Sequence, residues 1–279
     1  MKKLFIIIVA LVVPFFLFRS LHADFFNSLN KTLNNKDVQT GLKIAKSLLS
    51  ISEEDEIEIG RMAGGMLILK FGLYQDPVAV KYVNLIGKLL ISRCERTNLK
   101  FHFNILNTDS VNAYACPGGF IFITKGALRE AKNEDELAAV IAHEISHVTL
   151  KHELKEIRKS AVLKELSERF AEKNHEVIKQ LSNFVVNTLL VKGRNRKDEF
   201  EADKHSLNYL RDHNYNPLLN SFLSRLVTDN SVSGKLSYLN STHPPISERL
   251  NELDPISDFA GTPVDMRKMR FEFSIFNIK

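Results

Sequence analysis

The sequence predicts a single α+β domain that is mainly α-helical and carries a small antiparallel sheet. Phe101, Phe103 and Ile105 alternate with polar residues, and 120–124 is a second strand-like segment. Most of the remaining chain has apolar residues at helical spacing. The chain has 279 residues, of which 44% are hydrophobic and 25% are charged, so its composition is that of a globular protein with one sizeable core.

Residues 1–23 are predicted to form a signal peptide. Lys2 and Lys3 precede the apolar run Leu4–Phe18, and Ala23 offers a cleavage point. The run is shorter than the ~20 residues that cross a bilayer as a helix, and Pro14 interrupts it. An uncleaved membrane anchor is the alternative, and no cysteine near the junction supports a lipid anchor. We therefore expect an exported, periplasmic protein, with membrane association as the second reading.

The charge pattern argues against a nucleic-acid partner. The formal net charge is +5, and removal of residues 1–23, which carry three basic and no acidic side chains, lowers it to +2. Elsewhere basic residues are interleaved with acidic ones. The one local basic cluster, 192–197, is interpreted as a solvated loop. Export permits a disulfide between Cys94 and Cys116, but the sequence leaves their pairing open.

Local signals place the elements in order. An N-terminal helical segment, residues 24–54, ends near Ser52, which is a candidate cap for a helix with an acidic first turn. A helix over 76–93 begins with Pro77 at its first position. The segment 111–119 joins the two strand-like segments in a sheet of about three strands, and Pro117 marks a strand end or edge. From Asn133 onward helices dominate, and the tail after Pro255 is expected to be peripheral.

The stretch AAVIAHEISHVTLKHE, residues 138–153, combines an apolar helix with ionisable side chains. Asn133 and Glu136 resemble a capping box at its start. His143 and His147 are 40° apart on a helical wheel, so both rings reach one point. The pattern His-Glu-x-x-His suits one Zn²⁺ ion, with Glu144 placed to take a proton from the attacking water.

A third metal ligand is expected on a helix from about Asp198 to Asp212. On that wheel Glu199 and Asp203 lie within the apolar face, whereas Glu201 falls on the polar face. A buried carboxylate pair needs a positive partner. We assign Glu199 to the metal and Asp203 to a hydrogen bond with a metal-binding histidine.

These residues resemble a family of zinc metallopeptidases that includes the CAAX prenyl proteases, HtpX, Oma and BepA/LoiP. The similarity rests on HEISH, on the later EFEAD, on NAYACPGG followed by FIFITKGAL, and on STHPPISER. It covers roughly residues 55–252, which we interpret as the metallopeptidase domain of zincin type, followed by a tail at 253–279. The small exported bacterial members are the nearest in organisation, because the multi-helix membrane domain of the prenyl proteases and the repeat domain of larger periplasmic members have no counterpart in the sequence.

The resemblance implies further roles. His243 and Arg249 would lie near the metal and face the substrate carbonyl or oxyanion, and His243 would alternatively block the open metal position. Asn112 and Ala113 would lie on an edge strand that pairs with an extended substrate. The expected activity is hydrolysis of internal peptide bonds in misfolded envelope proteins, and outer-membrane assembly machinery is the further partner suggested. A chaperone with a structural zinc ion and an aminopeptidase are the alternatives.

Overall fold

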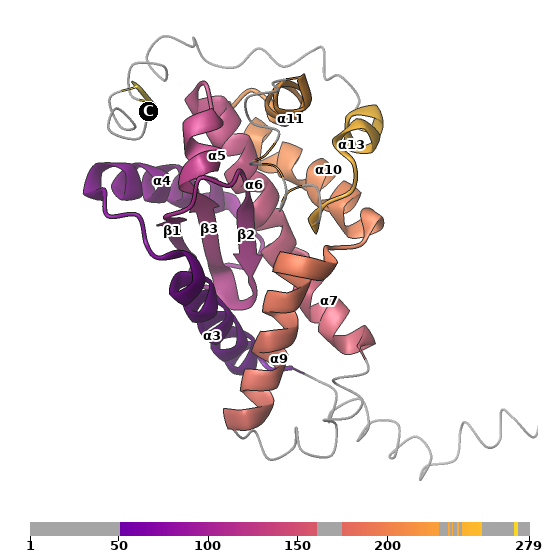
Figure 1. Cartoon of the computed structure of the whole chain (residues 1–279). Helices are drawn as coiled ribbons and strands as arrows, with labels where there is room; N and C mark the ends of the chain where they lie inside the picture. Colours follow the sequence, from indigo (N-terminus) through magenta and orange to yellow (C-terminus); the bar gives the residue numbers. More distant parts are fainter. Residues whose placement is uncertain are drawn as a thin grey trace, which may run out of the picture. The chain divides into compact units, whose positions relative to one another are not determined.

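The computed structural model describes residues 51–160, 175–228, 234, 236, 239, 242–252 and 271–272. The predicted signal peptide, the 24–50 part of the predicted N-terminal segment and most of the predicted tail lie outside the described residues. The mainly helical α+β class is confirmed: helices surround one small sheet (Figure 1).

The sheet has three strands in the order β1-β3-β2. They are β1 (His102–Leu106), β2 (Ala113–Cys116) and β3 (Phe120–Thr124). β2 and β3 are antiparallel, as predicted, with Ala113 opposite Ile123. β1 pairs with β3 in parallel, so the sheet is mixed and differs from the prediction in this one pairing. Pro117 directly follows β2, the edge strand, in the short helix η2 (Pro117–Gly119), as expected.

The two faces of the sheet contribute to two separate hydrophobic clusters. One cluster includes Ile105, Ile121 and Ala115 and is covered by α4 (Pro77–Leu90) and α6 (Glu134–Thr149). The other includes Tyr114 and Phe122 and is covered by α3 (Glu53–Phe71) and α9 (His175–Asn187). Successive strand residues point to opposite faces, so the sheet forms a wall between two cores.

Helix starts follow local sequence signals, of which the Ser52 cap and Pro77 in a first turn were predicted. Ser52 and Asp55 form a complete capping box at the start of α3. Asp76 accepts hydrogen bonds from two backbone amides at the start of α4, with Pro77 in the first turn. α4 ends at Leu90 and continues as the 3₁₀ turn η1 (Ile91–Arg93), within the predicted range.

The structure describes several further helices. They are α5 (Lys125–Glu130), α7 (His152–Lys159), α10 (Arg196–Asp212), α11 (Leu219–Thr228) and α13 (Ile246–Glu252), with a π-helical turn, η3 (Thr188–Lys192), after α9. Of these, α7, α10 and α11 contact α6. α6 lies between the sheet and α10 (Figure 1), and nearly all of its residues are buried. A helix in this position presents its polar side chains to the interior, which is where the candidate site forms.

Three remaining expectations can be compared with the structure. Cys94 and Cys116 are both buried, unpaired thiols in different hydrophobic clusters. Phe271 of the expected peripheral tail is fully buried and contacts Tyr82, so that part of the expectation is wrong. Among the described residues, no helix combines the length and apolar character needed to cross a bilayer.

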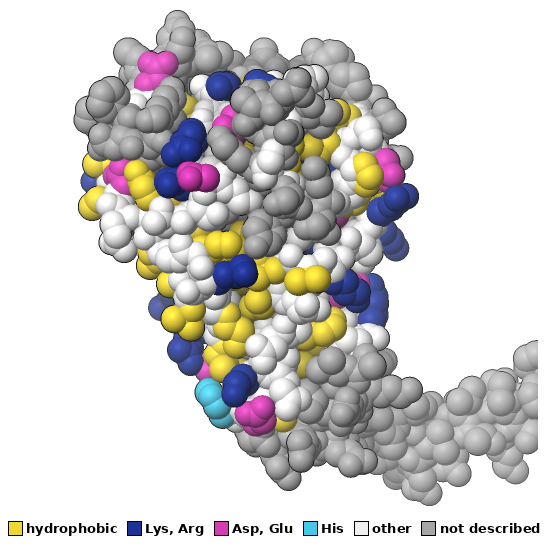
Figure 2. Space-filling view, viewed as in Figure 1, with side chains coloured by type: hydrophobic (Ala, Val, Ile, Leu, Met, Phe, Trp, Pro, Cys, Tyr) yellow, Lys and Arg dark blue, Asp and Glu magenta, His cyan; other side chains and the backbone are white. Residues whose placement is uncertain are grey.

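On the face shown in Figure 2, hydrophobic side chains lie between basic ones.

Candidate metal centre

α6 presents three ionisable side chains to the interior, each at most 3% exposed: His143, Glu144 and His147. The Nε2 atoms of the two histidines are 3.0 Å apart, as their spacing of four residues predicts. Asn133 caps the helix by accepting from the Glu136 amide. The Glu136 carboxylate accepts from the Lys132 amide instead of that of Asn133, so the predicted capping box is only half formed.

α10 brings a carboxylate to the same point. Glu199 is fully buried, with one oxygen 3.5 Å from His143 Nε2 and the other 3.4 Å from His147 Nε2. Asp203, one turn later, is 1% exposed. The Glu201 side chain is 42% exposed, so the burial pattern follows the predicted helical phase.

Asp203 accepts a hydrogen bond from His143, whose Nδ1 is 2.8 Å from Oδ1. A carboxylate only accepts, so Nδ1 of His143 carries a proton, and Nε2 is the nitrogen that remains to bind a metal ion. Arg249 donates to both Asp203 oxygens, at 2.9 Å from Nε and 2.6 Å from a terminal nitrogen. Arg249 lines the pocket, and its guanidinium is bound to Asp203 behind His143, so the substrate-facing role implied by the resemblance stays a prediction.

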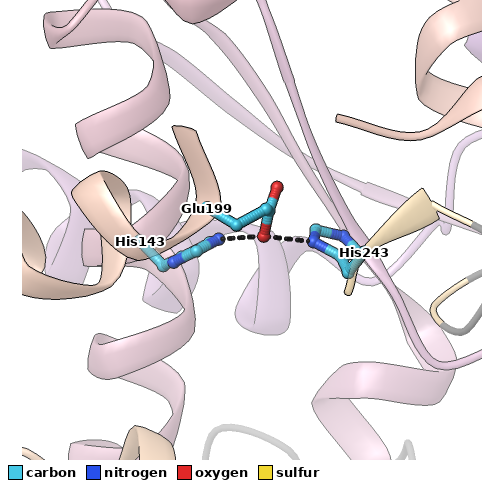
Figure 3. A group of neighbouring side chains, drawn as sticks. All are labelled: His143, Glu199 and His243. Atoms are coloured by element: carbon cyan, nitrogen blue, oxygen red, sulfur yellow. Dashed lines mark hydrogen bonds and ion pairs between the residues drawn. The ribbon is translucent and has the colours of Figure 1, made fainter. Parts of the chain in front are cut away.

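His243 lies on the opposite side of Glu199 from His143 (Figure 3). Its Nδ1 is 2.6 Å from Glu199 Oε2, and its backbone amide donates to the Leu239 carbonyl. His143, Glu199 and His243 present ligand atoms within 4.8 Å of one another. The structure therefore places His243 at the predicted site.

Arg194 is a site residue that sequence reasoning missed, because the cluster 192–197 was interpreted as a solvated loop. Its side chain is 4% exposed and lies 2.7 Å from Glu153, 3.7 Å from Glu144 and 3.9 Å from Glu199. Its backbone amide donates to the Thr242 carbonyl, which ties this loop to the segment carrying His243. The one sequence signal that could have drawn attention to Arg194 is the preceding Gly193, which suggests a turn. In the structure Gly193 has φ +76° and follows the π-helical turn η3.

The charges around the site hold its side chains in different protonation states. Burial alone would lower the pKa of His143, but Asp203 and Glu199 outweigh it and raise that pKa to about 9. Burial lowers the pKa of His147 well below its ordinary range, and Arg194 acts in the same direction. Burial opposes ionisation of Glu199, yet nearby histidines, first among them His243, lower its pKa well below the usual value.

A pocket opens beside Glu144 and His243. Its apolar wall includes Val140 of α6 and Phe222 of α11, and Asn112 and Ala113 line it from the sheet. The backbone of Asn112 bonds to Thr124 on β3, so the next residue, Ala113, directs its backbone groups to the outer edge of β2. The predicted substrate-binding pair thus lies beside the metal-ligand candidates.

The residues present fit a divalent metal ion. Two imidazole nitrogens and a carboxylate converge on one point, which is the donor set of a catalytic zinc site. Glu199 Oε1 and Glu144 Oε2 are buried and accept no hydrogen bond from any described residue. Buried carboxylate oxygens are costly without a partner. An ion bound by Glu199, with a solvent molecule beside Glu144, would supply those partners.

A helix bearing His-Glu-x-x-His, crossed by a second helix that supplies a buried glutamate, defines a metallopeptidase-type site. The family model for peptidase family M48 matches residues 78–257, which include every predicted site residue. The chain belongs to peptidase family M48.

Similar proteins bear related names. The beta-barrel assembly-enhancing protease of Escherichia coli (strain K12) is 38% identical over 108 residues, which are 39% of this chain and 22% of that protein. The mitochondrial metalloendopeptidase OMA1 of Schizosaccharomyces pombe is 29% identical over 174 residues, 62% of this chain and 51% of that protein. The metalloprotease YcaL of Escherichia coli (strain K12) is 27% identical over 158 residues, 54% and 60% respectively. The chain thus covers only part of each relative.

Proposed function

We propose that this chain is an exported zinc-dependent metalloendopeptidase. The observation that carries the proposal is the buried convergence of His143, His147 and Glu199, with Glu144, whose Oε2 accepts no hydrogen bond from a described residue, beside an open pocket. The first three residues would hold one zinc ion through Nε2, Nε2 and a carboxylate oxygen. When bound, the ion supplies Lewis-acid chemistry that polarises the scissile carbonyl and acidifies the attacking water.

The protein's own side chains handle the proton and the developing charge. Glu144 takes a proton from the attacking water and passes it to the leaving amine. His243 donates a hydrogen bond to the carbonyl oxygen as it becomes an oxyanion, or would help to hold the ion in a resting state. Asp203, held by Arg249, fixes the orientation of His143.

The substrate is an extended polypeptide that lies along β2. The outer edge of this strand is engaged at the Ala115 carbonyl by Arg194 and at the Ala113 amide by Asn112 Oδ1, and its Ala113 end lies next to the pocket. The buried Asn112 Nδ2 donates to no described residue and is placed to donate to a substrate carbonyl. Added-strand pairing recognises backbone and not sequence, and the apolar pocket favours an apolar side chain next to the cleaved bond.

Such recognition suits unfolded proteins, which expose both extended backbone and apolar side chains. The predicted signal peptide supports an activity in the bacterial envelope, where misfolded envelope proteins would be the substrates. The name of one relative, beta-barrel assembly-enhancing protease, supports outer-membrane assembly machinery as a further partner.

The substitution Glu144→Gln tests the assignment because it removes the base and leaves the ligands in place. We expect full-length Glu144→Gln protein to bind zinc as wild type does and to cleave an unfolded protein about 10²–10⁴-fold more slowly. Equal cleavage rates would sink the proposal. Peptides blocked at the N-terminus separate the alternatives, since an aminopeptidase leaves them intact. A chaperone with a structural zinc ion predicts that Glu144→Gln keeps its biological activity.

A further inference from the structure

His152 is a fully buried histidine, 1% exposed, that the mechanism above does not use. Its Nδ1 lies 2.8 Å from Nδ1 of the candidate zinc ligand His147, and its Nε2 lies 3.3 Å from a Glu201 oxygen. The three side chains form a line from the metal centre to the surface, because the Glu201 side chain is 42% exposed.

The contact between His147 and His152 depends on a break in the helix. Five residues along a continuous α-helix correspond to 140°, which would turn the two rings away from each other. α6 ends at Thr149, and Lys151 adopts φ 57° and ψ 40°, a left-handed conformation uncommon for a residue other than glycine. The chain therefore turns before α7, and the rings meet with centroids 4.9 Å apart at 72°.

The hydrogen bonds that join His147, His152 and Glu201 can have only one donor-to-acceptor order if His147 binds a metal ion. His147 must keep the lone pair of Nε2 free for a metal ion, so its proton is on Nδ1. That proton can be donated only if Nδ1 of His152 accepts, which places the His152 proton on Nε2, facing the acceptor Glu201. The reverse direction would protonate His147 on Nε2, at the point where the ligand atoms converge.

We infer that His152 is a positioning residue for the zinc site. His152 holds His147 in its metal-binding tautomer, and Glu201 in turn orients His152. This inference rests on the proposed zinc site. It gives each metal-binding histidine an acceptor at Nδ1: Asp203 for His143 and His152 for His147. Loss of such an outer partner typically weakens metal binding 10–100-fold.

A second cation is the competing interpretation, because His152, Asp198 and Glu201 place ligand atoms within 4.8 Å of one another. Two contacts argue against it. The Lys155 ammonium lies 3.5 Å from Glu201, and Asp198 accepts from the Asn195 side chain at 2.6 Å. A metal on Nε2 of His152 would also reverse the hydrogen bond with His147.

The test measures zinc affinity by chelator competition with full-length protein. We expect one zinc ion per wild-type chain and a 10–100-fold weaker affinity in His152→Leu. His152→Asn should restore affinity to near the wild-type value, because asparagine Oδ1 replaces Nδ1 as an acceptor. The matched control is His205→Leu, which removes a partly buried histidine of α10 that bonds to Ser146 and not to a ligand.

Each result has a distinct meaning. A wild-type chain that binds no zinc would refute the proposed function itself. If wild type binds zinc and His152→Leu binds it equally well, or if the Leu and Asn variants are equally weakened, the positioning role is wrong. Two ions per chain, with the second lost in His152→Asn, would also overturn it. Should His152→Leu not fold, a nitrogen–nitrogen coupling across the hydrogen bond in zinc-loaded wild type decides the question, and its absence refutes the inference.

Discussion

Arg249→Leu should destabilise the protein strongly, because it removes the main partner of a buried carboxylate. Arg249 is 2% exposed and Asp203 is 1% exposed, and two hydrogen bonds join them. Removing one partner of a buried ion pair costs about 3–5 kcal/mol. Asp203 would retain His143 at 2.8 Å, which favours the lower end of that range. For a chain of this size the loss lowers Tm by roughly 6–20 °C.

The assay is urea unfolding of chelator-treated, full-length protein at pH 7.5, so that metal binding does not contribute. Wild type, Arg249→Leu, Asp203→Asn and the double variant form a cycle, in which the double variant should be more stable than the summed losses predict. The control is Arg196→Leu, since Arg196 pairs with Glu248 at the surface and its loss should cost less than about 1 kcal/mol. The reasoning would be refuted if Arg249→Leu lost less than about 1 kcal/mol of unfolding free energy, or if the loss in the double variant equalled the sum of the two single losses.

Three further predictions concern the metal and the pocket. Glu199→Ala should lose zinc during dialysis, whereas Glu201→Ala, which removes an outer partner of His152 but no metal ligand, should weaken zinc binding far less, as measured by metal analysis. Equal zinc content in Glu199→Ala and wild type would contradict the helical-phase assignment. Because the pKa of His143 is raised to about 9 without metal, zinc must displace a proton below that pH, so affinity should rise about tenfold per pH unit between pH 7 and 9. An affinity that does not change over this range would contradict that prediction. Val140→Phe should narrow the pocket and shift cleavage toward peptides with smaller side chains next to the cleaved bond. Mass spectrometry of a cleaved peptide library measures this preference, and an unchanged preference would show that the pocket does not set the specificity.

The parts of the site that lie on one helix could be predicted from the sequence. Helical periodicity alone sets the angle between His143 and His147, and it separates Glu199 and Asp203 from Glu201. Caps are equally local, as Ser52 and Asp76 show. Such features need no knowledge of what packs against the helix.

Features that depend on packing between distant segments could not be predicted. An alternating pattern states which face of a strand is buried, but not which strand lies beside it, so the parallel pairing of β1 with β3 was missed. Arg194 resembles its solvated neighbours in sequence, and its burial follows from carboxylates on α6, α7 and α10. His152 is turned toward His147 only by the left-handed backbone of Lys151.

The buried charges around the site give a further reason to expect a divalent cation. Four carboxylates, those of Glu144, Glu153, Glu199 and Asp203, lie within 4 Å of the guanidinium of Arg194 or Arg249. Four negative and two positive charges leave a formal charge of −2 among side chains that are almost inaccessible to water. An uncompensated buried charge is costly, and a doubly charged ion between His143, His147 and Glu199 cancels this one. Without metal, the proton that the raised pKa retains on His143 offsets half of it, which is why proton and metal should compete for the same site.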